Sequence, residues 1–405
     1  MPTLSSLSPQ LRQYLVVTGN YWAFTLTDGA LRMLVVLYFH QQGYSPLDIA
    51  LLFLFYEFFG VVTNLIGGWL GARLGLNTTM NLGLGLQVGA LAMLLVPAEM
   101  LTLVWVMAAQ ALSGIAKDLN KMSAKSSIKL LVPDNTQGSL YKWVAILTGS
   151  KNALKGIGFF MGGLLLSSVG FTHAIAIMAG ALTLVWLASL FLLKQDLGKA
   201  TYKPKFKEIL SKSAAVNRLS AARLFLFCSR DIWFVVALPV YLATELAWQH
   251  SAIGSFMACW IIGYGLVQAF APHLTGKRSG KLPDGQHAFG WALALSLVPA
   301  AIALSLNLSE MPTQWILIGG LLVFGAVFAI NSSLHSYLIV SYAKEDGVSL
   351  DVGFYYMANA KGRLIGTVLS GWVYQVAGLE ACLWLSSAFV IIAAIISLSL
   401  PRHPS

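Results

Sequence analysis

The chain contains twelve runs of about 20 or more mostly apolar residues, separated by short polar segments. A helix that crosses a bilayer needs about 20 consecutive apolar residues. Only 10% of the residues are charged, against roughly 25% in soluble globular domains. These features predict an all-α integral membrane protein, and they exclude an ordinary soluble enzyme, a disordered chain and a nucleic-acid binder. The predicted spans are residues 14–39, 47–72, 77–96, 101–119, 141–166, 171–193, 218–243, 251–274, 286–306, 313–340, 351–377 and 379–400.

Lysine and arginine are distributed asymmetrically around these spans. The segments after odd-numbered spans contain neither residue. Eight of the 26 basic residues fall well inside spans, and the other 18 lie in the two tails, in the segments after even-numbered spans or, for Lys142 and Arg218, at the span ends that adjoin those segments. Short cytoplasmic loops carry the excess of Lys and Arg in membrane proteins. We therefore expect both termini and the long central loop to face the cytoplasm.

The longest hydrophilic segment, 194–217, divides the chain into two sets of six spans. It predicts an N-terminal six-helix bundle at 1–193, a cytoplasmic loop at 194–217 and a C-terminal six-helix bundle at 218–405. Two parallel six-span repeats are the arrangement of major facilitator transporters. Gly67–Gly75 also resembles the loop signature of that superfamily, with Ala72 in place of its usual acid. The resemblance implies the major facilitator fold, with two six-helix bundles around a central cavity.

A second glycine-rich stretch, Gly158–Gly163, resembles the antiporter signature of the same superfamily, with phenylalanine in place of its proline. For the glycines of both signatures we favour a packing role, because small residues let membrane helices approach closely.

Charged residues within the spans are the main functional signal. Each costs roughly 2.5–3.5 kcal/mol at the bilayer centre, so we expect each to face a cavity or a partner. Those well inside the spans all lie on spans 1, 2, 4, 5, 7 and 11, which border the central cavity in the major facilitator fold. The excess of basic over acidic residues predicts a substrate that is an anion, with more than one negative charge. The basic residues are Arg32, Lys117, Lys151, Lys155, Arg223, Arg230, Lys361 and Arg363, and the acids well inside spans are Asp28, Glu57 and Asp231.

We expect seven of these cations to bind substrate, namely Arg32, Lys117, Lys151, Lys155, Arg230, Lys361 and Arg363. For Asp28, Glu57 and Asp231 two roles stay open: uptake of a coupling proton, or a structural partnership with a neighbouring cation. Asp28 and Arg32 lie one helical turn apart on the same face, whereas Asp231 only adjoins Arg230 in sequence.

Other polar residues of the spans receive structural interpretations. Lys121, Lys125 and Lys129 continue the spacing of Lys117 at intervals of four, and we favour a solvated cytoplasmic face or contacts with lipid headgroups. For His335 we favour a packed, hydrogen-bonded side chain over a proton carrier.

The sequence contains no motif typical of an enzyme. It lacks a His-Glu-x-x-His helix, a P-loop and a Gly-x-Ser-x-Gly elbow. Cys228, Cys259 and Cys382 all lie in apolar runs, which argues against disulfides and thiolate metal sites. We therefore expect neither catalysis nor a cofactor nor a bound metal.

Four longer stretches resemble one particular family of the superfamily, the organoarsenical efflux transporters of the ArsJ type. They are Asn20–Arg32, Phe55–Gly60, Lys117–Lys125 and Gly149–Gly156. The resemblance implies a multi-pass protein of the bacterial inner (cytoplasmic) membrane, surrounded by membrane lipids. It also implies that the protein is an antiporter and confers arsenic resistance by efflux.

The same resemblance implies a substrate. Glyceraldehyde-3-phosphate dehydrogenase, the functional partner, can use arsenate in place of phosphate and form 1-arseno-3-phosphoglycerate, which the transporter exports. Such an ester has two anionic ends and fits a surplus of cations. Proton uptake could drive the export.

Two alternatives stay open at this point. A sugar-phosphate or inorganic-phosphate exchanger of the same fold would use a similar basic cavity. A membrane-embedded lipid enzyme or scramblase would need a nucleophile–base pair, and the sequence offers no clear one.

Overall fold

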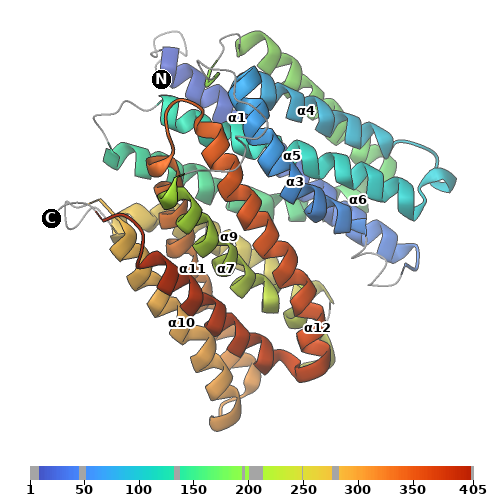
Figure 1. Ribbon diagram of the computed structural model, residues 1–405. Helices are drawn as coiled ribbons and strands as arrows, with labels where there is room; N and C mark the ends of the chain where they lie inside the picture. Colours follow the sequence, from blue (N-terminus) through green and yellow to red (C-terminus); the bar gives the residue numbers. More distant parts are fainter. Residues whose placement is uncertain are drawn as a thin grey trace. The chain divides into compact units, whose positions relative to one another are not determined.

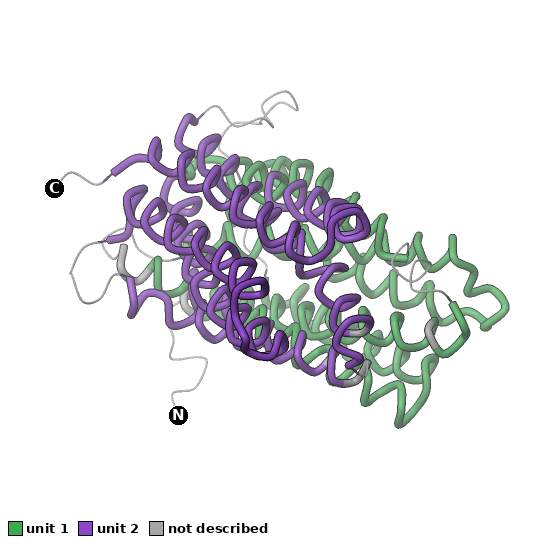
Figure 2. The backbone as a smooth tube through the Cα atoms, turned by 90° about the horizontal axis from the view of Figure 1, so that it is seen from below, with its two compact units in different colours: residues 1–143, 150–211, 343–357 green, residues 144–149, 212–342, 358–405 purple. Residues whose placement is uncertain are grey.

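A computed structural model describes residues 9–44, 52–131, 137–193, 197–199, 213–248, 250–275 and 282–402. Within these ranges the regular elements are α-helices and one 3-10 turn, Ala98–Met100 (Figure 1). The chain divides into two compact units, coloured green and purple in Figure 2, and each is described by itself. Most of the predicted central loop lies outside the described residues, and its boundaries stay a prediction.

Unit 1 consists of residues 1–143, 150–211 and 343–357. Its helix α5 packs against α1, α3 and α4. The unit also takes in most of α6 and the beginning of α12. The helix bounds are α1 Pro9–Gln41, α3 Leu54–Leu74, α4 Leu76–Met93, α5 Leu103–Leu131, α6 Gln137–Leu192 and α12 Val348–Ser397.

Unit 2 consists of residues 144–149, 212–342 and 358–405. Its helix α11 packs against α7, α9 and α10, and the remainder of α12 completes the unit. The helix bounds are α7 Ala214–Phe234, α8 Ala237–Thr244, α9 His250–Thr275, α10 Gly285–Leu308 and α11 Thr313–Tyr342.

All twelve predicted spans fall on helices in the part of the chain that the structure describes, with 47–51 outside that part. Two helices, α6 and α12, each cover two predicted spans and change direction at one glycine. Gly170 has φ 77° and Gly378 has φ 76°, in the region that residues with a Cβ rarely adopt. The connections predicted after spans 5 and 11 are therefore tight turns at Gly170 and Gly378 in the structure.

Span 7 differs from expectation, because it is broken into α7 and α8. Pro239 has no N–H and its ring would clash with the carbonyl of the residue four positions earlier in a continuous helix, which is Val235. At the break, two backbone N–H groups donate hydrogen bonds to a side chain instead of to a helix carbonyl. Ser370 Oγ of α12 accepts hydrogen bonds from the N–H groups of Val236 (3.3 Å) and Ala237 (3.1 Å).

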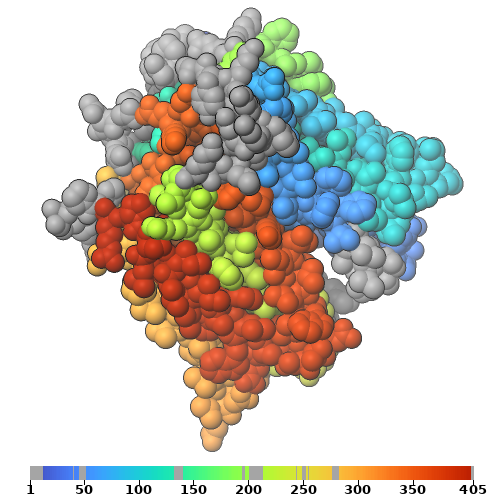
Figure 3. Space-filling view, viewed as in Figure 1, coloured from blue at the N-terminus to red at the C-terminus, as the bar shows by residue number. Residues whose placement is uncertain are grey.

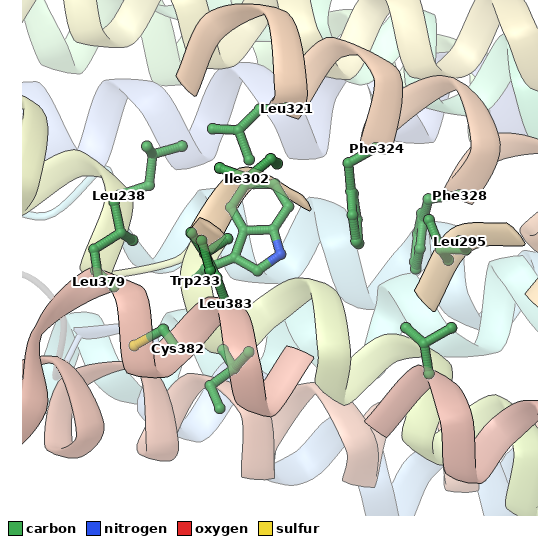
Figure 4. Packing of buried hydrophobic residues seen from close by; sticks show 14 of the residues in the cluster. Trp233, Leu238, Leu295, Ile302, Leu321, Phe324, Phe328, Leu379, Cys382 and Leu383 are labelled. Atoms are coloured by element: carbon green, nitrogen blue, oxygen red, sulfur yellow. The ribbon is translucent and has the colours of Figure 1, made fainter. Parts of the chain in front are cut away.

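The core of unit 2 is aromatic. Trp233 of α7 is fully buried and meets Phe324 of α11 edge-on, with ring centres 5.0 Å apart. Figure 4 shows the Trp233 ring among side chains of α10, α11 and α12, including Ile302 and Leu383. This core holds α7 in a defined position, and α7 carries the charged residues of this unit.

The surface is apolar over long stretches, as expected of a protein surrounded by lipid. Seven helical segments of the described residues are long and apolar enough to cross a membrane. Large side chains such as Leu184, Phe191 and Trp372 are mostly exposed, and Figure 3 shows side chains of α12, in orange to red, on the outer surface. Soluble monomers rarely expose such extensive apolar patches. The protein is therefore a multi-pass membrane protein.

Candidate functional site

Tyr56 of α3 is the residue around which the charged side chains of unit 1 gather. Its side chain is 1% exposed, and its hydroxyl donates a hydrogen bond of 2.7 Å to Asp28 of α1. Two cations lie against the ring: Lys117 Nζ is 3.7 Å and Arg32 Cζ is 4.5 Å from its centre. Cations over an aromatic face are attracted by the ring quadrupole. Tyr56 of α3 thus contacts an acid and a cation of α1 and a second cation of α5.

Asp28 and Arg32 lie one turn apart on α1, and each has a partner on α3. Arg32 Nη2 is 3.3 Å from Glu57 Oε1, and the two side chains are 23% and 16% exposed. The guanidinium also lies over the ring of Phe53, at 5.2 Å from its centre. An oxyanion would compete with the Glu57 carboxylate for this guanidinium, because both are anionic acceptors.

The lysines of α5 are not on a solvated face, and our interpretation of Lys121 and Lys125 was wrong. These side chains are 7% and 2% exposed. The helix continues to Leu131, and neither glycine nor proline occurs between residues 115 and 132. The beginning of α12 covers it, and the ring of Tyr356 contacts both lysines. Lys129 is partly buried and donates to the backbone carbonyl of Ala343.

Asp118 is the acid among these lysines. Its carboxylate is 2.5 Å from Lys121 Nζ and 3.9 Å from Lys117 Nζ, and its side chain is buried. One carboxylate therefore contacts two consecutive lysines of the same helix face. The remaining predicted cations of unit 1, Lys151 and Lys155, lie on α6 and are partly exposed. Lys155 Nζ is 5.9 Å from the ring centre of Phe159.

Asp231 of α7 is the centre of the charged cluster of unit 2. It is fully buried and contacts two arginines. Arg230 Nε donates to Oδ1 at 2.6 Å, and Arg363 Nε of α12 donates to Oδ2 at 3.3 Å. Adjacency in sequence gave no reason to expect the first contact. Two guanidinium groups on one carboxylate leave this cluster with a net positive charge.

The other basic residues of unit 2 differ in their surroundings. Arg223 is buried, donates to Asn359 Oδ1 at 2.8 Å and to the carbonyl of Ser332 at 3.2 Å, and lies over Phe227. Lys361 is exposed on α12. His335 is buried as predicted, but its Nδ1 has no hydrogen bond with the residues that the structure describes, so the expected hydrogen bond is wrong for that atom.

Glycines place the first helix of each unit against a later helix in the same way. A Cβ at Gly158 of α6 would lie 2.6 Å from the carbonyl oxygen of Leu26, and one at Gly162 would clash with that of Ala30. This confirms the packing role for the second signature. On α12, a Cβ at Gly362 would likewise crowd the carbonyl oxygen of Leu224 of α7, and one at Gly366 would crowd that of Cys228, four positions later.

The four carbonyl contacts align the two repeats. Leu26 corresponds to Leu224 and Ala30 to Cys228. Two positions further along, Arg32 corresponds to Arg230. Each of these arginines has a carboxylate partner and lies against aromatic rings. The repeat therefore presents one paired arginine in each unit.

These clusters suit the binding of anions. Arginine offers planar, bidentate donors to oxyanions, and lysine offers a compact charge. The residues that sequence reasoning missed are the aromatic ones, above all Tyr56 and Tyr356. Tyr56 directly precedes Glu57 in the sequence, and this adjacency to an intramembrane acid was the available signal.

Comparisons with known proteins agree with the helical architecture. The family model described as Major Facilitator Superfamily matches residues 15–235 and again 219–405. None of the curated proteins compared with the chain matches it. A crystal structure of the human organic anion transporter MFSD10 (TETRAN) is similar, with a TM-score of 0.75, 15% identity, and 96% of this chain and 100% of that chain covered.

Two further crystal structures have the same fold. A bacterial homologue of the iron transporter ferroportin, in an outward-facing state, has a TM-score of 0.72 and 15% identity, covering 97% of this chain and 99% of that one. The E. coli fucose:proton symporter FucP has a TM-score of 0.71 and 13% identity, covering 98% and 100%. Because the family model matches nearly the whole chain, the protein belongs to the Major Facilitator Superfamily and has its fold.

Proposed function

We propose that this secondary transporter exports a small organic anion with an arsenate ester at one end and a phosphoryl group at the other, 1-arseno-3-phosphoglycerate. Its export from a bacterial cell across the inner membrane would confer arsenate resistance. The resemblance of Asn20–Arg32 and three other stretches to organoarsenical efflux transporters supports a substrate that contains arsenic. The charged clusters support a substrate that is an anion.

The observation that carries the proposal is the paired arginine of each unit. Arg32 and Arg230 occupy corresponding positions, and each lies against aromatic rings that restrict its orientation. In unit 2 one carboxylate serves two arginines. Each unit by itself therefore offers a cationic group to an oxyanion. The human transporter that is similar in fold is described as an organic anion transporter, which agrees with an anionic cargo.

The geometry suggests how substrate and proton could exchange. Exchange requires that the anion and the proton occupy the protein alternately. After the anion beside Arg32 leaves on the far side of the membrane, Glu57 would take up a proton there, carry it back in the substrate-free protein and release it to the cytoplasm, where the next anion binds. This cycle would exchange one proton for the anion, and both termini would face the cytoplasm as the distribution of Lys and Arg predicts. Asp28 and Asp231 are the other candidate proton acceptors.

The test is expression in an arsenate-sensitive bacterium, with and without glyceraldehyde-3-phosphate dehydrogenase that acts on arsenate. We expect resistance only when both proteins are present. The matched variants Arg32→Gln and Arg230→Gln should each reduce resistance, whereas Lys142→Gln, which replaces an exposed lysine, should not. Resistance from the transporter alone, or none with both proteins, would contradict the proposal.

A sugar-phosphate or inorganic-phosphate exchanger is the second candidate, favoured by the same cations. It predicts that inorganic phosphate at micromolar concentrations competes with the organic substrate for transport in vesicles. Weak competition would favour the organoarsenical. A lipid enzyme or scramblase predicts altered or redistributed lipid headgroups instead of substrate flux.

A further inference from the structure

Lys121 and Lys125 form a buried cationic pair that the substrate-binding cations named above do not include. They lie one turn apart on α5, and the Tyr356 ring centre is 4.6 Å from Lys121 Nζ and 5.7 Å from Lys125 Nζ. Their burial, at 7% and 2% exposure, removes the water that would otherwise screen two like charges at this spacing. Asp118 is shared between Lys117 and Lys121. The pair therefore places two ammonium groups close together in a buried part of unit 1.

A second observation points to a ligand at the same place. The hydroxyl of Tyr21 on α1 is buried, at 1% exposure of the side chain, and has no hydrogen-bond partner among the described residues. Tyr21 is close enough to Tyr356, Asp118 and Asp28 to interact with them electrostatically. Buried hydroxyl groups are normally hydrogen-bonded, and an exception calls for an explanation such as a bound ion or water. An oxyanion beside the lysines would accept this hydrogen bond.

We propose that Tyr21, Lys121 and Lys125, together with the ring of Tyr356, form a subsite for a tetrahedral oxyanion. Phosphoryl and arsenyl groups share the required chemistry: several acceptor oxygens and more than one negative charge, which suit two ammonium groups and a phenol. Lysine binds phosphate as a point charge and does not need the planar geometry of arginine. The subsite deepens the proposed function and rests on it for the direction of transport, but not for binding.

The experiment measures binding to the purified full chain in detergent, by calorimetry, with 3-phosphoglycerate and with inorganic phosphate as probes. We expect wild type to bind 3-phosphoglycerate. Lys121→Gln and Lys125→Gln should each weaken that binding at least about tenfold, because hydrogen bonds to charged groups are the strong ones. Tyr21→Phe should weaken it several-fold, and Lys142→Gln should leave it unchanged. Lys142 is the matched control because it is an exposed lysine near an aromatic ring, that of Trp143.

Each result is decisive. Lys→Gln variants that bind like wild type overturn the subsite and leave the proposed function standing. A wild-type protein that binds neither probe contradicts both. A fall in melting temperature with unchanged affinity means that the lysines only pack against Tyr356, which also overturns the subsite. If the Gln variants fail to fold, Lys121→Arg and Lys125→Arg keep the charge and should still bind, and loss of binding in these folded variants would reject the proposal. Inorganic phosphate that binds as tightly as 3-phosphoglycerate, with the same dependence on Lys125, supports a subsite for the phosphoryl group alone.

Discussion

The hydroxyl of Tyr56 and the carboxylate of Asp28 form a hydrogen bond of 2.7 Å that connects α3 to α1. The same ring lies against Arg32 and Lys117. The positions of both cations therefore depend on how this one tyrosine is held.

Replacing Tyr56 by phenylalanine should separate the effect of its hydroxyl, which bonds Asp28, from the effect of its ring, which lies against the two cations. The ring remains against Arg32 and Lys117, but Asp28 loses a donor at a buried position. Leaving a buried acceptor unsatisfied costs about 1–3 kcal/mol, so the melting temperature should fall and the KM for transport should rise. Tyr38→Phe is the control, because the ring of Tyr38 is partly exposed and stacks on Phe171. Equal melting temperatures and KM values for Tyr56→Phe and wild type would show that the bond to Asp28 has no effect.

Asp231 should be more important for stability than other acids of unit 2, because it contacts two arginines while fully buried. Asp231→Asn leaves Arg230 and Arg363 without their shared carboxylate, and breaking a buried ion pair costs about 3–5 kcal/mol. Adding Arg363→Gln should restore part of this loss. A double-mutant cycle on the free energy of unfolding measures the coupling.

The control for this cycle is Glu380→Gln, which changes an acid that accepts a hydrogen bond from Trp384 at an exposed site. It should alter stability by less than about 0.5 kcal/mol. Strictly additive effects of Asp231→Asn and Arg363→Gln would mean that the observed contact carries no energy.

Gly158 tests the close approach of α6 to α1. An added Cβ would lie 2.6 Å from the backbone oxygen of Leu26 and 3.0 Å from the nitrogen of Ala30, and backbone atoms cannot give way as a flexible side chain can. Gly158→Ala should therefore lower the melting temperature. Gly163→Ala on the same helix is the control, because its nearest neighbour would be a leucine side chain at 3.7 Å. Alanine favours helix formation over glycine by about 1 kcal/mol, so this control should be neutral or slightly stabilising. Two variants with the same melting temperature would contradict the packing role.

The helices were predictable from sequence because the information is local. Runs of apolar residues placed the two spans on either side of Gly170 in α6 and the two on either side of Gly378 in α12, but the turns at these glycines came from the structure. The ends of helices were harder to predict. Polar residues after 119 suggested the end of a span, but α5 continues through Lys121 and Lys125, since polarity does not end a helix that other residues cover.

The partners of the charged residues were less predictable, since they come from distant parts of the chain. Lys121 is covered by Tyr356, more than 200 residues later. Asp231 pairs with Arg363, 132 residues away. A single sequence shows that buried charges need partners but not which ones, because the choice depends on helix packing. The sequence analysis singled out Gly158 and Gly162 but not Gly362 and Gly366, and the correspondence of Arg32 with Arg230 follows only from the contacts of all four glycines.

Glu57 is the acid through which we expect proton coupling, and Glu57→Gln should abolish it. Glutamine still contacts Arg32 but cannot carry a proton in the substrate-free protein. In inside-out vesicles, where export appears as uptake, an acidic lumen should stimulate uptake of the substrate by wild type, because protons leave as the anion enters. The Glu57→Gln variant should give the same uptake rate with and without the pH gradient, while exchange of internal for external substrate continues. Glu245→Gln, which changes an exposed acid, should behave like wild type. Full stimulation of Glu57→Gln by the gradient would move the role to Asp28 or Asp231, and a wild type indifferent to the gradient would exclude proton coupling altogether.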